Sequence, residues 1–197
     1  MKRTALSAIL IFAAVLAVFG GNAIFAQDKA QDKAQDKARD KYTLEVPGGL
    51  AFAEFRGYES WPVIAVSENG GEIAAILGNP IMIDALKAGV PGNGKPFPDG
   101  AMMAKIHWNP KKQEAYPGQP TVPGTQHDMD FMLKDSNRFS DSGGWGYAEF
   151  EYDAASDTFR AGNLNDSPPQ ANDAKCGYAC HTIVKGRDYV FTEYGHR

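Results

Sequence analysis

Two stretches in the middle of the chain alternate between apolar and other side chains, as a half-buried β-strand requires. Residues 101–108 place a row of apolar side chains on one face and leave Met103, Lys105 and His107 on the other. Residues 128–135 repeat this alternation, again with an apolar row on one face. Each stretch is therefore predicted to be a strand that packs one face against a core.

Other segments predict further strands and one helix. Residues 61–66 are rich in β-branched side chains, residues 145–152 form a third, aromatic strand, and residues 188–192 are expected to end the domain as a short strand. An Asn-Pro pair at 79–80 predicts the start of a helix, and Gly89 predicts its end. Because strands outnumber helices and most connections are too short for parallel crossovers, we predict an α+β fold. It is a mainly antiparallel β-sheet domain with a few short helices.

The first 26 residues have the organisation of an export signal. Lys2 and Arg3 form a basic start, residues 5–19 are almost entirely apolar, and small residues follow them. The apolar stretch is short for a membrane span, and an uncleaved N-terminal anchor is the alternative. We therefore expect residues 1–26 to be a signal peptide and the mature protein to be periplasmic, where thiols are oxidised or chemically used.

Residues 27–41 form a low-complexity segment in which Gln-Asp-Lys-Ala recurs and then degrades. Its apolar content is limited to single alanines, so it cannot bury enough surface to join a core. We interpret it as a solvated linker, which leaves residues 42–197 as one folded domain.

Composition narrows the class of protein. The chain has 197 residues, and Lys+Arg 20 against Asp+Glu 24 leaves a formal net charge of -4. This balance argues against a nucleic-acid partner, since such proteins present a basic surface. Two cysteines are too few for a disulfide-dense scaffold, so the chemical interpretation depends on where those two lie.

Both cysteines belong to one short segment, Cys176-Gly-Tyr-Ala-Cys180-His181. The common attachment signature for c-type haem is Cys, two residues, Cys and His, and here the spacing is one residue longer. On a helix, residues four apart still share a face, so both sulfurs could reach one macrocycle. A disulfide is a second interpretation, and a zinc site that recruits two of His107, His127 and His196 is a third. The spacing alone leaves all three open.

Several segments, in this order and spacing, resemble the cytochrome P-460 family, which includes the β-type cytochromes c-prime. The similarity covers nearly all of the mature domain from residue 58 onward. The segments are YESWPV at 58–63, ILGN at 76–79, FPDGAMMAKIHW at 97–108, GWGY at 144–147, and CH at 180–181 with GRDYVF at 186–191. The extra residue between the cysteines departs from the family pattern.

The resemblance implies a mainly antiparallel β domain, often a homodimer, that holds one five-coordinate haem c. By similarity, His181 is the axial iron ligand, and Cys180 and Cys176 are the attachment sites. The opposite face of the iron then stays open for small nitrogen species. The short helix that carries the attachment segment would place these groups together.

The resemblance also implies two alternative activities. Catalytic members oxidise hydroxylamine and have a lysine bonded to the haem edge, and Lys105 is the candidate for that position. They also use a carboxylate for proton transfer, for which Asp173 is a candidate, and His107 could serve as a pocket base. Electrons would leave through a periplasmic electron-transfer protein. Other members bind nitric oxide without turnover.

The rival hypothesis is a haem-free β domain in which a Cys176–Cys180 disulfide serves a binding or structural role. The lengthened spacing between the cysteines is the sequence feature that favours it.

Overall fold

The computed structural model describes residues 40–48, 50–162 and 177–195. Within the chain, Lys41–Arg197 forms one compact unit. The predicted signal peptide and nearly all of the predicted linker lie outside the described residues. None of the helices in the described ranges has the length and hydropathy needed to span a membrane.

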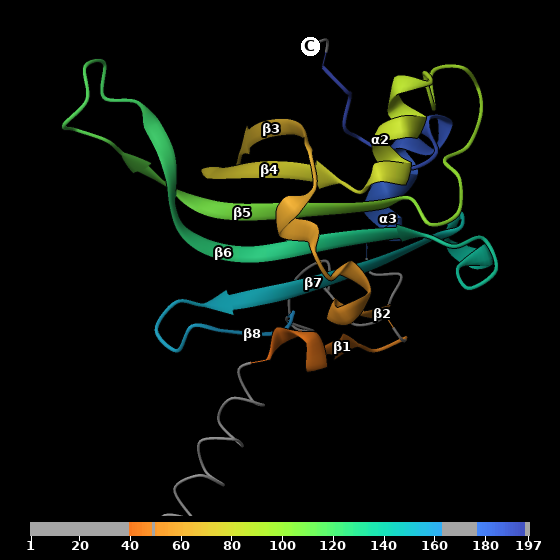
Figure 1. Ribbon diagram of the computed structural model, residues 1–197, viewed down its shortest axis with the longest axis horizontal. Helices are drawn as coiled ribbons and strands as arrows, with labels where there is room; N and C mark the ends of the chain where they lie inside the picture. Colours follow the sequence, from red (N-terminus) through yellow and green to blue (C-terminus); the bar gives the residue numbers. More distant parts are fainter. Residues whose placement is uncertain (1–39, 49, 163–176, 196–197) are drawn as a thin grey trace, which may run out of the picture. The chain divides into compact units, whose positions relative to one another are not determined.

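A six-stranded antiparallel sheet forms the centre of the domain, and its strands lie side by side in the order in which they occur along the chain (Figure 1). Successive strands are therefore joined as a meander, which confirms the predicted α+β, mainly antiparallel class. The strands are β3 (Val63–Asn69), β4 (Glu72–Gly78), β5 (Met102–Lys112), β6 (Thr121–Lys134), β7 (Trp145–Asp153) and β8 (Thr158–Ala161). A separate pair, β1 (Glu45–Val46) and β2 (Leu50–Ala51), precedes the sheet.

The sheet has two strands, β4 and β8, that the hydrophobic pattern did not predict. Asn69 pairs with Glu72 across a two-residue turn in which Gly70 and Gly71 both have positive φ, at 62° and 86°. A type I′ turn requires this conformation at both positions, and two glycines adopt it without a steric cost. This turn is therefore the tip of a hairpin, and its return strand is β4.

The helix predicted from the Asn-Pro pair is α2 (Pro80–Lys87). The Asn79 side-chain oxygen accepts the Met82 amide at 2.9 Å, as an N-cap does, and also accepts the Met102 amide at 3.1 Å. Gly89 follows the helix at φ 85°, the left-handed conformation that terminates helices. The capping prediction is confirmed, and Asn79 in addition ties the helix start to the beginning of β5.

The two faces of the sheet carry separate hydrophobic cores. Phe131 and Phe150 project from the first face against the N-terminal segment, where Phe52 lies with ring centroids 5.1 and 4.8 Å from theirs. The second face packs against α2 and the C-terminal segment through Met103, Trp145 and other apolar side chains. The predicted split of residues 101–108 into two faces is confirmed, because Ala104 joins the first core and Met103 the second.

The C-terminal segment consists of α3 (Tyr178–His181), the 3-10 segment η5 (Thr182–Arg187) and an extended end. It lies near α2 at one end of the sheet (Figure 1). The predicted strand over residues 188–192 is wrong, because Asp188 and Tyr189 have φ of 48° and 64°. A strand cannot contain two consecutive left-handed residues, and here they turn the chain back over the second face.

Candidate functional site

A cavity of about 580 Å³ lies between the second face of the sheet and the C-terminal segment. Strands β3 to β7 supply its floor, and α3 with the end of the chain supplies its opposite wall. Its volume falls within the range of about 300–1,000 Å³ typical of sites for small molecules and cofactors. It is also the place where the sequence-predicted residues Lys105, Cys180 and His181 meet.

The floor of the cavity has an apolar row beside a charged row. Met103 pairs with Met132, which pairs with Tyr147 on the next strand. Two residues along, Lys105 pairs with Asp130, and Asp130 pairs with Glu149. Directly paired residues of an antiparallel sheet project from the same face, so both rows face the cavity. All six residues of the two rows line the cavity: Met103, Lys105, Asp130, Met132, Tyr147 and Glu149.

His181 ends helix α3 and lines the opposite wall. Its Nδ1 lies 2.6 Å from the Tyr189 carbonyl oxygen, which can only accept, so Nδ1–H is the donor. Burial is the largest influence on this imidazole and lowers its pKa, which favours the neutral ring. With Nδ1 protonated, Nε2 carries the lone pair and is the nitrogen able to bind a metal.

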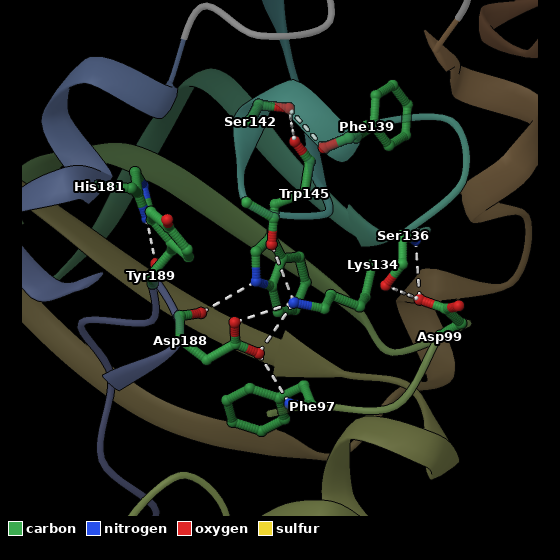
Figure 2. A network of polar contacts seen from close by, with 11 residues as sticks. Phe97, Asp99, Lys134, Ser136, Phe139, Ser142, Trp145, His181, Asp188 and Tyr189 are labelled. Carbon is green, nitrogen blue, oxygen red and sulfur yellow. Dashed lines mark hydrogen bonds and ion pairs between the residues drawn. The ribbon is translucent and has the colours of Figure 1, made fainter. Parts of the chain in front are cut away.

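A buried ion pair fixes the backbone that holds this histidine (Figure 2). Lys134 Nζ donates to Asp188 Oδ1 and Oδ2 at 2.9 and 3.0 Å and to the Gly143 carbonyl at 3.0 Å. Asp188 Oδ2 also accepts the Phe97 amide at 2.7 Å, and its carbonyl accepts the Trp145 indole N–H at 2.9 Å. Asp188 precedes Tyr189, so these contacts hold in place the carbonyl that orients His181.

Cys180 precedes His181, is exposed, and lines the cavity. Cys176 and Asp173 lie outside the described residues. Lys105 is half-buried on the opposite floor. The structure thus brings three of the five predicted site residues to one cavity.

His107 does not line the cavity, although it shares a strand face with Lys105. Its Nε2 lies 3.3 Å from Asp130 Oδ2, and its Nδ1 lies 3.0 Å from Glu72 Oε2. Burial opposes its charge, but the hydrogen bond and charge of Asp130 and the charge of Asp128 outweigh it and raise the pKa to about 9. The raised pKa favours the protonated ring and the side chain lies outside the cavity lining, so the role of His107 as a pocket base stays a prediction.

Two carboxylates that the sequence analysis did not single out line the cavity instead. Asp130 and Glu149 lie beside Lys105 in the charged row. The signal for Asp130 was present in the sequence. It alternates with the apolar row of residues 128–135 and therefore had to project from the face opposite that row.

These features fit a haem. The donor set offers a thiol next to an imidazole whose neutral form is favoured, and the same cavity has an apolar row on its floor and apolar side chains on its wall. Phe191 lies 4.9 Å from the His181 ring, yet it is 47% exposed at the cavity. An apolar macrocycle bound there would cover this aromatic surface.

Comparison with known proteins agrees with this geometry. The family model for cytochrome P-460 matches residues 55–192, which is most of the chain. A search of curated proteins found no match. The family match indicates a haem cofactor, and its range contains Lys105, Asp130, Cys180 and His181. The chain belongs to the cytochrome P-460 family.

Proposed function

We propose that this chain is an exported c-type haem protein that oxidises a small nitrogen compound, with hydroxylamine as the first candidate. The observation that carries the proposal is the cavity itself, which joins Cys180 and His181 on one wall to Lys105 and Asp130 on the other. One haem would be attached covalently through Cys180, and also through Cys176 if the longer spacing permits it.

His181 would hold the iron through Nε2. The Tyr189 carbonyl accepts the N–H on the other ring nitrogen, and such a partner fixes the tautomer and orientation of a ligating imidazole. When bound, the haem would supply an open iron coordination position for the nitrogen species and would accept its electrons.

Lys105 and Asp130 favour oxidation over simple gas binding. The oxidation of hydroxylamine releases protons as well as electrons, so a turnover site needs a proton acceptor near the substrate. Asp130 lines the cavity, and its side chain is 43% exposed, which allows it to accept a proton and pass it to water. Lys105 is its cross-strand partner and our candidate for a covalent bond to the haem edge.

Export is supported by the basic and apolar start of the chain, and electrons would leave to a periplasmic electron-transfer protein. A homodimer is the proposed assembly. Sedimentation of the haem-loaded protein would test it, with a monomer mass as the contradicting result.

The test of function is hydroxylamine-dependent reduction of an electron acceptor by the haem-loaded protein. Asp130→Asn should lower turnover at least tenfold, because general-base catalysis contributes about 10²–10⁴-fold. Lys105→Ala should change the optical spectrum, because loss of a bond to the macrocycle alters its electronic structure. Lys111→Ala, an exposed lysine on the same strand, is the matched control.

Two outcomes would contradict the proposal. A protein that binds nitric oxide but does not turn over hydroxylamine would be a gas-binding member of the family. A protein that folds equally well without haem, with Cys176 and Cys180 joined, would support the disulfide alternative.

A further inference from the structure

Four side chains of types that can bind a metal ion meet at the end of the sheet face beyond the charged row. They come from three adjacent strands: Glu72 begins β4, His107 lies on β5, and His127 and Asp128 lie on β6. None of the four lines the haem cavity described above.

These groups form a closed ring in which imidazole and carboxylate alternate. His107 Nδ1 lies 3.0 Å from Glu72 Oε2 and 3.4 Å from Asp128 Oδ1. His127 Nδ1 lies 2.6 Å from Asp128 Oδ2 and 3.8 Å from Glu72 Oε1. Each carboxylate meets the two imidazoles through different oxygens, so small side-chain rotations are needed to bring one donor atom from each residue to the separation of about 3.4 Å found between tetrahedral zinc ligands.

A β-bulge creates this arrangement. His107 pairs with Asp128, and the next residue, Trp108, pairs with Gln126, so His127 is an extra residue on β6. In a regular strand His127 and Asp128 would project from opposite faces. The bulge changes the direction in which one of these two side chains projects, so both reach the same cluster.

One buried oxygen of the ring lacks a hydrogen-bond partner among the described residues. Asp128 is only 8% exposed, and its buried Oδ1 has no hydrogen-bond partner within the described part of the chain. A buried carboxylate oxygen without a partner is costly. The nearest cationic atom is His107 Nδ1, which already contacts Glu72 at the shorter distance.

The second ring nitrogen of His107 has the environment of a metal-ligating histidine. Its buried Nε2 makes no well-aligned hydrogen bond within the described part of the chain, and Asp130 Oδ2, 3.3 Å away, is the carboxylate to which a metal-bound imidazole would donate this N–H. The ligand atoms of His107, Asp128 and Asp130 all lie within 4.8 Å of one another. An ion can enter from solvent, because the side chains of His127 and Glu72 are 51% and 35% exposed.

We propose that Glu72, His107, His127 and Asp128 bind one divalent transition-metal ion of the zinc type, with Asp130 orienting His107. Two imidazole nitrogens and two carboxylate oxygens suit Zn²⁺ better than Ca²⁺ or Mg²⁺, which select all-oxygen sites.

The test is calorimetric titration of the chelator-treated, haem-loaded protein with Zn²⁺. We expect one ion per chain at this site and at least a tenfold loss of affinity in both His127→Gln and Asp128→Asn. His127 is half-exposed, so His127→Gln keeps the fold even if Asp128→Asn does not, and circular dichroism checks both. Glu114→Gln and Asp84→Asn, two exposed carboxylates outside the cluster, are controls that should leave affinity unchanged.

X-ray absorption at the zinc edge gives an independent readout that the haem iron does not obscure. The expected first shell contains two imidazole nitrogens at about 2.0–2.1 Å together with carboxylate oxygens at about 2.0–2.2 Å. A first shell without imidazole would overturn the proposal. So would the absence of binding, or binding that His127→Gln leaves unchanged. These results do not depend on Cys180 or His181, so they leave the proposed haem function untouched.

Discussion

Replacing Lys134 by methionine should destabilise the domain more than any comparable change at a surface ion pair. The Lys134 side chain is 5% exposed and that of Asp188 is 12% exposed. Methionine keeps much of the packing volume of lysine but loses the charge that Nζ places 5.1 Å from the centroid of the Trp145 ring. The substitution therefore isolates the loss of the charge and of its hydrogen bonds.

The expected loss of folding stability depends on the hydrogen bond that Asp188 keeps after the substitution. Removing one partner of a buried ion pair typically costs about 3–5 kcal/mol, because the remaining charge has no counterion. Asp188 still accepts the Phe97 amide at 2.7 Å, so we expect the lower end, about 3 kcal/mol. For a domain of this size, each kcal/mol lowers Tm by about 2–4 °C, which gives a loss of about 6–12 °C.

Thermal unfolding of the haem-loaded protein, followed by far-ultraviolet circular dichroism, measures this loss. Arg138→Met is the control, because Arg138 pairs with Glu54 at 2.6 Å but its side chain is 38% exposed. Exposed pairs contribute about 0–1 kcal/mol, so this variant should lose no more than about 4 °C. If the Tm of the Lys134→Met variant falls no further than that of the Arg138→Met variant, the buried pair does not stabilise the C-terminal segment and our reasoning is wrong.

Two further predictions concern the core and the cavity wall. Phe131→Ala, at a side chain that is 1% exposed and stacks on Phe55 at 4.1 Å, should lower the free energy of unfolding by about 3–5 kcal/mol in urea denaturation. A loss below 1 kcal/mol would show that the first core does not depend on it. Gly177→Ala should reduce haem content with the sheet intact, because the new Cβ would lie 2.5 Å from Tyr147 Cδ1 and push the start of α3 away from β7. Equal haem absorbance per chain in this variant and in the unsubstituted protein would contradict the proposed position of the haem.

Local patterns in the sequence were sufficient for four of the six strands of the sheet and for the helix. Alternation assigned Met103 and Ala104 to opposite faces, and the N-cap and glycine signals bounded α2, because each depends on residues close in the chain. Residues 72–78 and 158–161 lack a clean alternation, since β4 is largely buried and β8 is short. Their strand character comes from the neighbours with which they pair.

The candidate site was predictable in its chemistry but less so in its geometry. Cys180, His181 and Lys105 were assigned by motif and resemblance, and the structure brings them to one cavity. The left-handed turn at Asp188 depends on Lys134, which is 54 residues away, and no local signal reveals that pair. The bulge at His127 likewise has no signal in the local sequence, because a bulge is defined by the register of two strands.

The mass of the denatured mature chain tests the central claim most directly. The protein should be produced in a host that attaches c-type haem, and it should be measured beside a Cys180→Ser variant. The account predicts a gain equal to one haem that survives denaturation and that is lost or sharply reduced in the variant. A bare polypeptide mass, in protein that is folded, would contradict covalent haem attachment and would leave the family resemblance as a statement about the fold.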